Sequence, residues 1–182
     1  SNIKTFDYYP ISQGTIYMGV DLGRQEDFTV CTLMDKDGQV IEMYRARQQE
    51  WNFIINDIVE LARHSKAHVL IEANSIGDVI YEQVKKRYNK TDPFVTTNKS
   101  KQEIIEGLIL DFNEGNISIP SQKLFGPLYN ELQSFTYEYS QKTRAVKYGS
   151  PTGLHDDCVM SLAIANYARK TMRKKGSYSW IK

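Results

Sequence analysis

Three consecutive apolar runs at the start of the chain constrain the fold most strongly. They cover residues 16–21, 28–34 and 39–44, and each has the length and composition of a strand. Residues 35–38 read Asp-Lys-Asp-Gly, which are typical of a tight hairpin turn between the second and third runs. The chain is therefore predicted to open with three strands joined in antiparallel order.

Helical and strand-like segments alternate after these three runs. Apolar residues recur at helical spacing in segments 51–62, 76–84, 104–112 and 124–135. Short strand-like segments occupy 67–71, 94–95 and 117–119, a polar turn at 140–143 indicates a β-hairpin, and a long helix is predicted over 156–173. This pattern predicts an α/β fold: a mixed central sheet of three antiparallel strands then parallel strands, flanked by helices, with an added β-hairpin.

Length and composition fit one globular domain. The 182 residues are 41% hydrophobic and 25% charged, and we expect residues 15–172 to form the domain, 1–14 to be a linker or tag remnant, and 173–182 to be a basic tail. The net charge of +1 means that any nucleic-acid surface must be local. No apolar run approaches the roughly 20 residues of a membrane span, so we expect no membrane partner. Cys31 and Cys158 lack the spacing of a disulfide framework or zinc site.

Acidic residues stand at the ends of apolar elements, where a solvated surface would not place them. Asp21 and Glu72 each end a buried run, and Asp156 and Asp157 open the long apolar helix. Buried carboxylates are costly unless they are paired or bind a metal, and carboxylates suit Mg²⁺ or Mn²⁺. Asp21 could instead be a turn acid and Asp156 a helix N-cap, but Glu is neither a turn residue nor common in strands. The combination favours two-metal phosphodiester hydrolysis.

Short motifs surround each of these acids. Residues 17–23 read Tyr-Met-Gly-Val-Asp-Leu-Gly with Asp27 shortly after, residues 70–77 read Leu-Ile-Glu-Ala-Asn-Ser-Ile-Gly, and residues 155–163 read His-Asp-Asp-Cys-Val-Met-Ser-Leu-Ala. In order and spacing these resemble the three acidic motifs of the nuclease domain of tailed-phage terminase large subunits. Segments 96–105 and 114–120 resemble that family too, so the resemblance covers about 16–169.

The resemblance implies a ribonuclease H-like fold and a divalent-metal-dependent endonuclease that holds two Mg²⁺ or Mn²⁺ ions. Asp21, Glu72, Asp156 and Asp157 would be the ligands, with Asp21 bridging both ions. Many relatives carry a further acid three residues after the second Asp, where this chain has Met160. We favour Asp157 as the essential member of the pair and keep Asp156 as a ligand of the second ion.

Auxiliary roles rest on fewer observations. His155 could donate to a phosphate or transfer a proton, or it could be a solvated residue before a helix. Lys101 could contact a phosphate, or be a solvated charge, and Asn74 would shape the turn after Glu72. On the hairpin, Arg144 and Lys147 could bind a DNA backbone, or simply decorate its surface.

The same resemblance names partners. We expect double-stranded DNA as substrate, an ATPase domain upstream in the same polypeptide, and the portal and small terminase subunit as partners, in the cytoplasm of a phage-infected host. The chain itself has no GxxxxGK[ST] phosphate loop. The alternatives are a Holliday-junction resolvase or transposase-like nuclease of the same superfamily, or an actin-like nucleotide-binding domain, whose duplicated core needs about twice this length.

Overall fold

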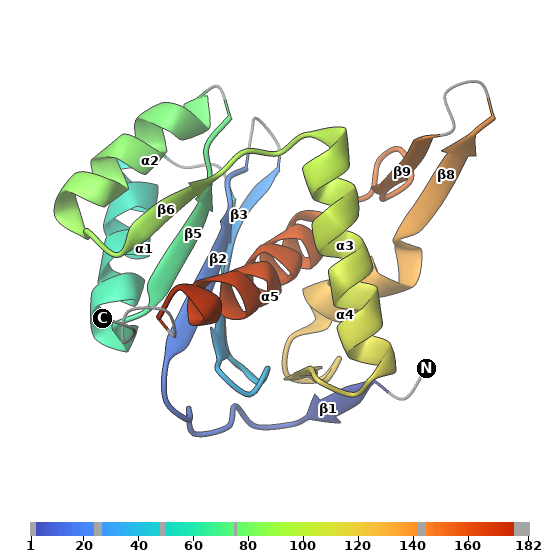
Figure 1. The fold of residues 1–182 in the computed structure, drawn as a ribbon, viewed down its shortest axis with the longest axis horizontal. Helices are drawn as coiled ribbons and strands as arrows, with labels where there is room; N and C mark the ends of the chain where they lie inside the picture. Colours follow the sequence, from blue (N-terminus) through green and yellow to red (C-terminus); the bar gives the residue numbers. More distant parts are fainter. Residues whose placement is uncertain (1–2, 24–26, 48–49, 75, 142–144, 177–182) are drawn as a thin grey trace, which may run out of the picture.

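A five-stranded sheet lies at the centre of the molecule (Figure 1). The computed structural model describes residues 3–23, 27–47, 50–74, 76–141 and 145–176. In chain order the elements are β1 (Lys4–Phe6), β2 (Ile16–Asp21), β3 (Phe28–Asp35), β4 (Val40–Arg47), α1 (Trp51–Ser65), β5 (His68–Glu72), α2 (Ile76–Arg87), β6 (Thr91–Phe94), α3 (Asn98–Asn113), β7 (Ser118–Pro120), α4 (Gly126–Ser134), β8 (Thr136–Ser140), β9 (Ala145–Gly149) and α5 (Asp157–Gly176).

The sheet is mixed, as predicted. Its strand order is β4-β3-β2-β5-β6. Strand β3 is antiparallel to both of its neighbours, β2 and β4, whereas β5 and β6 are parallel to β2. The predicted hairpin is also present, since β8 and β9 pair antiparallel and project from the body of the fold (Figure 1). Because β2 and β5 are parallel, both end at one edge of the sheet, and the antiparallel β3 begins at that same edge.

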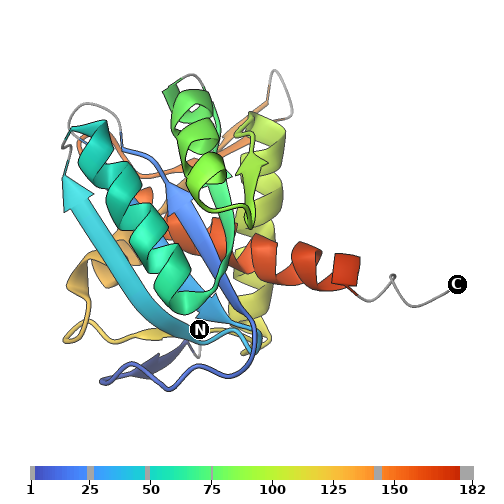
Figure 2. The same cartoon turned by 90° about the vertical axis from the view of Figure 1, so that its left-hand side faces the viewer.

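Helices cover both faces of the sheet. Helices α1 and α2 pack on one face (Figure 2). There Ile54, Ile58 and Val84 join a buried cluster with Val20 and Ile71. Helix α5 crosses the other face over β2 and β3, with α3 and α4 packed against it. Within the described part of the chain, no helix is long and apolar enough to cross a membrane.

Helix α5 approaches β2 closely at Gly19. A Cβ at this position would overlap the backbone of Ser161 and Ala165, so only glycine permits the observed distance between helix and strand. The Ser161 hydroxyl donates to the Gly19 carbonyl at 2.9 Å and also bonds the Thr32 hydroxyl at 2.8 Å. These contacts fix α5 against the two central strands and thereby fix the position of its first residue, Asp157.

The structure differs from the sequence-based expectation at the N-terminus. Within the segment expected to be a linker, Lys4–Phe6 forms β1, which pairs in parallel with β7, and Phe6 packs against the α5-side cluster. Strand β7 therefore lies outside the central sheet. The backbone of α5 continues to Gly176, beyond the expected domain boundary at 172.

The strand expected at Phe94 and Val95 lies slightly earlier in the chain. It is β6, Thr91–Phe94, and it contains Pro93. Proline cannot donate a hydrogen bond to a neighbouring strand, but β6 is at the edge of the sheet and has such a neighbour on one side only.

The packing at Gly19 gives the first prediction. Gly19→Ala should destabilise the fold by at least about 1–3 kcal/mol, the usual cost of overpacking, because backbone atoms rather than a flexible side chain occupy the space. The matched control is Gly107→Ala in α3, where a Cβ meets nothing within 4 Å and helix propensity favours alanine. Urea denaturation of both variants checks this, and equal stability of the two would contradict it.

Candidate metal centre

Four predicted acids from three parts of the chain meet at the sheet edge where β2 and β5 end. Asp21 and Glu72 are the last residues of these parallel strands, and Asp156 and Asp157 stand at the start of α5. All four line one pocket of about 180 Å³. Its full lining is Asp21, Leu22, Asp27, Glu72, Thr96, Lys101, Asp156, Asp157 and Met160.

The carboxylates raise one another's proton affinity. Burial, followed by the negative charges of Glu72, Asp157 and Asp156, holds the pKa of Asp21 well above its ordinary value. Burial also raises the pKa of Asp157, although its Oδ2 accepts a hydrogen bond from the Phe28 backbone N–H at 3.1 Å that partly opposes the rise. The negative charges of these carboxylates repel one another, so each disfavours ionisation of the others. A hard divalent cation, which prefers oxygen ligands, would relieve this repulsion.

Lys101 supplies positive charge at this pocket. Its Nζ lies 3.1 Å from Asp156 Oδ2, and both side chains are about a quarter exposed. A capping box formed by Thr97 and Ser100 starts helix α3 and places Lys101 in its first turn. Lys101, expected to be either a phosphate contact or a solvated charge, is paired with Asp156 in the structure.

His155 lies beside two carboxylates. Its Nδ1 is 3.5 Å from an oxygen of Asp27 and 3.5 Å from an oxygen of Asp157. The possible ligand atoms of these three residues all lie within 4.8 Å of one another, so they form a second group able to hold a metal ion. Asp27 was outside the predicted site, but the antiparallel return of β3 places it at the edge where β2 ends.

Asn74 and Gly77 support the loop that follows Glu72. The Asn74 amide donates to the Thr96 carbonyl at 2.7 Å and accepts from the Thr96 backbone N–H at 3.1 Å, joining the loops after β5 and β6. A Cβ at Gly77 would lie 2.7 Å from the Glu72 carbonyl oxygen. These contacts support the proposal that Asn74 shapes the turn after Glu72.

Glu131 was missed by sequence reasoning. It is buried in α4, and its Oε2 accepts from the backbone N–H groups of Cys158 at 2.7 Å and Val159 at 3.0 Å. It thereby caps the N-terminus of α5 immediately after the Asp156–Asp157 pair. No local spacing could reveal this cap, because it comes from another helix.

Of the two DNA contacts predicted on the hairpin, the structure describes one. Lys147 is exposed on β9, and Tyr148 beside it donates to Glu106 of α3 at 3.2 Å, which ties the hairpin to that helix. Arg144 lies outside the described residues.

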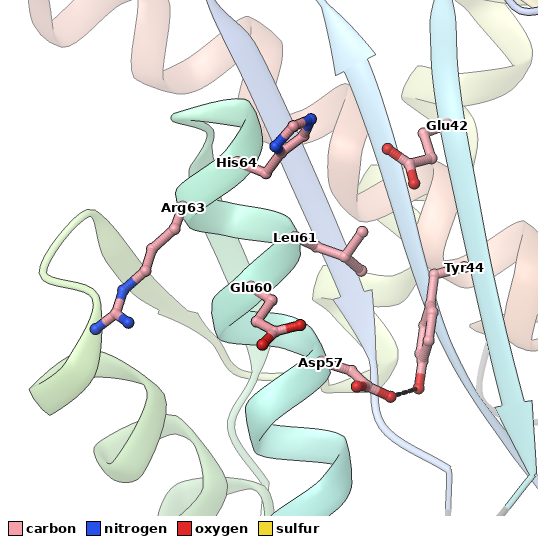
Figure 3. A pocket seen from close by; sticks show the side chains of 7 residues that line it. All are labelled: Glu42, Tyr44, Asp57, Glu60, Leu61, Arg63 and His64. Carbon is pink, nitrogen blue, oxygen red and sulfur yellow. Dashed lines mark hydrogen bonds between the residues drawn. The ribbon is translucent and has the colours of Figure 1, made fainter.

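A larger pocket, of about 730 Å³, lies on the α1 side of β4 (Figure 3). Its lining includes Glu42, Asp57 and Glu60, and the Tyr44 hydroxyl donates to Asp57 at 2.5 Å. These acids come from only two neighbouring elements, and none of the predicted site residues lines this pocket. The converging carboxylates of the smaller pocket indicate the chemical site.

A model of the "Terminase RNaseH-like domain" family matches residues 18–167, which is most of the chain. The chain belongs to this terminase family. The predicted family resemblance is confirmed, and the match includes all four predicted acidic ligands.

Individual members of the terminase family give the same assignment. The chain is 28% identical over 151 residues to the terminase large subunit of Thermus virus P23-45, a match that covers 81% of this chain and 30% of that protein. The chain thus spans less than a third of the relative's length. Two solved terminase nucleases share its fold: that of thermophilic phage G20c with bound magnesium (TM-score 0.77, 22% identity, covering 91% of this chain and 92% of that one) and that of bacteriophage SPP1 with bound manganese (0.63, 13%, 87% and 88%). The predicted ribonuclease H-like fold is confirmed.

The repulsion within this terminase-family pocket gives the second prediction. A carboxyl with a raised folded-state pKa contributes stability at low pH that is lost as pH rises through that pKa, so Asp21 lowers the stability of the metal-free protein above the ordinary pKa of an Asp side chain. In EDTA, Asp21→Asn should therefore leave the melting temperature unchanged or raised, and the difference from wild type should grow as pH rises above the ordinary Asp pKa of about 4.

Asp37→Asn serves as the control, since Asp37 is exposed at the opposite edge of the sheet. Thermal melts across this pH range test the idea. A fall in melting temperature of Asp21→Asn near neutrality would instead show that the ionised carboxylate stabilises the fold.

Proposed function

We propose that this chain is a divalent-metal-dependent endonuclease that cleaves double-stranded DNA during viral genome packaging. The observation that carries the proposal is the meeting of Asp21, Glu72, Asp156 and Asp157 in one pocket. Membership of the terminase RNase H-like family supports the substrate class and the biological setting.

We infer that Mg²⁺ or Mn²⁺ is the cofactor and that the four acids hold two ions. The donor set is all oxygen, and the related nucleases of phages G20c and SPP1 have been solved with bound magnesium and manganese. When bound, such ions activate a water molecule and stabilise the leaving oxygen of a phosphodiester. Asp21 is the proposed shared ligand, as the family resemblance implies, and it lines the pocket with the other three acids.

Residues in and beside the pocket would act around these ligands. His155 can donate to a phosphate oxygen or exchange a proton, and its contacts with Asp27 and Asp157 hold its ring at the pocket. Lys101 balances the charge of Asp156 and can turn to a bound phosphate, because its amine carries three donors. Lys147 and Arg144 are proposed contacts to the DNA backbone.

The wider setting follows from the family and is also proposed. The relative in Thermus virus P23-45 is a terminase large subunit more than three times as long as its match to this chain, which agrees with an upstream ATPase motor in the same polypeptide. The portal and the small terminase subunit would then be its assembly partners, and the cytoplasm of the infected host its place of action.

The third prediction tests the ligands and the cofactor together. Asp21→Asn, Glu72→Gln and Asp157→Asn should each lower plasmid cleavage by more than about 100-fold, because loss of an outer partner of a metal ligand alone costs about 10–100-fold. Mg²⁺ or Mn²⁺ should support cleavage, Ca²⁺ should support it poorly because it accepts looser coordination, and EDTA should abolish it.

Asp37→Asn and Glu60→Gln are matched controls on exposed acids away from the pocket, and both should cut normally. Cleavage that persists in excess EDTA would end the two-metal proposal. Normal activity in any one of the three variants would remove that residue from the ligand set.

The fourth prediction concerns specificity. The isolated domain should cut duplex DNA weakly and with little sequence preference, because a net charge of +1 allows few phosphate contacts and nothing in the sequence resembles a base-reading motif. Cleavage at low DNA concentration should weaken steeply with salt. Mapping the ends of digested plasmid at rising salt tests this, and a sharp consensus at the cut sites would contradict it. A strong preference for four-way junctions would instead favour the resolvase alternative.

A further inference from the structure

Three side chains that can carry positive charge surround the ring of Phe28. The Arg45 guanidinium lies over the ring, with its Cζ 3.4 Å from the ring centroid, and the Arg47 Cζ is 5.3 Å from the same point. His155 approaches the ring edge-on, with the two ring centroids 5.2 Å apart. The backbone N–H of Phe28 donates to Asp157, so this cluster is joined directly to a proposed metal ligand.

Strand register places both arginines at the edge of the sheet that holds the acids. Arg47 stands opposite Phe28, and Arg45 stands opposite Val30, which in turn faces Asp21 on β2. Strands β4 and β2 are two positions apart, a separation of roughly 10 Å at the usual strand spacing. At about 3.4 Å per nucleotide along the helix axis, that corresponds to about three steps of one DNA strand.

The charges of Arg45 and Arg47 are not paired with a carboxylate among the described residues. Stacking on an aromatic face leaves the edge of a guanidinium free to bind a phosphate. Among the described residues, Arg45 and Arg47 form no ion pair within 4.0 Å, and Arg45 Nε is buried without a hydrogen-bond partner. Arg45 also lines a pocket of about 320 Å³ with Asn130 and Ser134.

Glu131 lines the same 320 Å³ pocket and is the one competing partner to consider for Arg45 among the residues described there. Its Oε2 caps α5, while its Oε1 is buried without a hydrogen-bond partner. A purely structural role for Arg45 would be to balance this carboxylate. Arg47 is exposed and does not line the pocket, so that explanation does not extend to it.

We propose that Arg45 and Arg47 bind phosphates of the DNA strand where it leaves the metal centre on the β4 side. The proposal rests on the proposed nuclease function and adds a second set of contacts on β4, separate from those proposed on the hairpin. The opposite face of β4 presents Glu42 and the Tyr44–Asp57 pair, whose negative charge disfavours DNA there (Figure 3). In this proposal the DNA strand therefore follows the face of β4 that carries the two arginines.

The experiment measures binding of a labelled DNA duplex in Ca²⁺ by fluorescence anisotropy at rising NaCl. Arg45→Met and Arg47→Met keep an apolar stem on Phe28 and remove the charge. Each should weaken binding on the order of 10-fold at low salt, as expected when a charge-assisted hydrogen bond is removed. Each should also reduce the slope of log affinity against log salt by about 0.9 for every phosphate that the variant no longer neutralises. Arg63→Met on α1 is the matched control, and its affinity and slope should equal those of wild type.

Unchanged affinity and slope in both variants would overturn the proposal. If Arg45→Met lowers the melting temperature but leaves the salt slope unchanged, Arg45 serves to neutralise the charge of Glu131. Arg47→Met, which alters an exposed side chain, would then decide whether the DNA strand passes over Phe28. Plasmid cleavage in Mn²⁺ is measured in parallel. Cleavage that does not depend on the metal would contradict the proposed nuclease function. Metal-dependent cleavage together with unaltered DNA binding by both arginine variants would contradict this inference alone.

Discussion

The contact between α5 and β2 at Gly19 is the constraint on which the site depends. The absence of a side chain at Gly19 lets the helix backbone rest on the strand, and the Ser161 hydroxyl holds it there through the Gly19 carbonyl. Because Gly19 is two residues before Asp21 and Ser161 is four residues after Asp157, a shift of the helix would separate the carboxylates at once. Glu131 fixes the position at which α5 starts, because it accepts hydrogen bonds from the free backbone N–H groups of the first turn. Helix, strand and cap together hold the carboxylates in place.

That arrangement has an energetic cost in the absence of a cation. Burial and mutual repulsion raise the pKa values of Asp21 and Asp157, so the fold holds these carboxyl groups where their ionised forms are disfavoured. The surrounding structure offsets this cost with apolar packing on both faces of the sheet and with the ion pair between Lys101 and Asp156. A binding site that is strained when empty is a general consequence of preparing it for a charged ligand.

The sequence predicted the parts of the site that depend on the ends of regular elements. Asp21 and Glu72 could be found because each ends an apolar run, and parallel strands bring such ends together. Glu131 and Asp27 could not, because their places follow from a helix and a strand returning from elsewhere in the chain. Strand β1 escaped prediction for a different reason. Three residues are too few to show a period, and its pairing with β7 depends on contacts more than a hundred residues away.

The net charge of +1 conceals how charge is distributed on β4. Side chains alternate between the two faces of a strand, so neighbouring positions can carry opposite charges without meeting. Glu42 and Tyr44, with its partner Asp57, face α1, whereas Arg45 and Arg47 face Phe28 and the acidic pocket. These charges cancel in the net charge of the sequence, but in the structure they lie on opposite faces of the sheet. For a strand at the edge of a mixed sheet, the partition of charge between faces is therefore more informative about a nucleic-acid surface than the total.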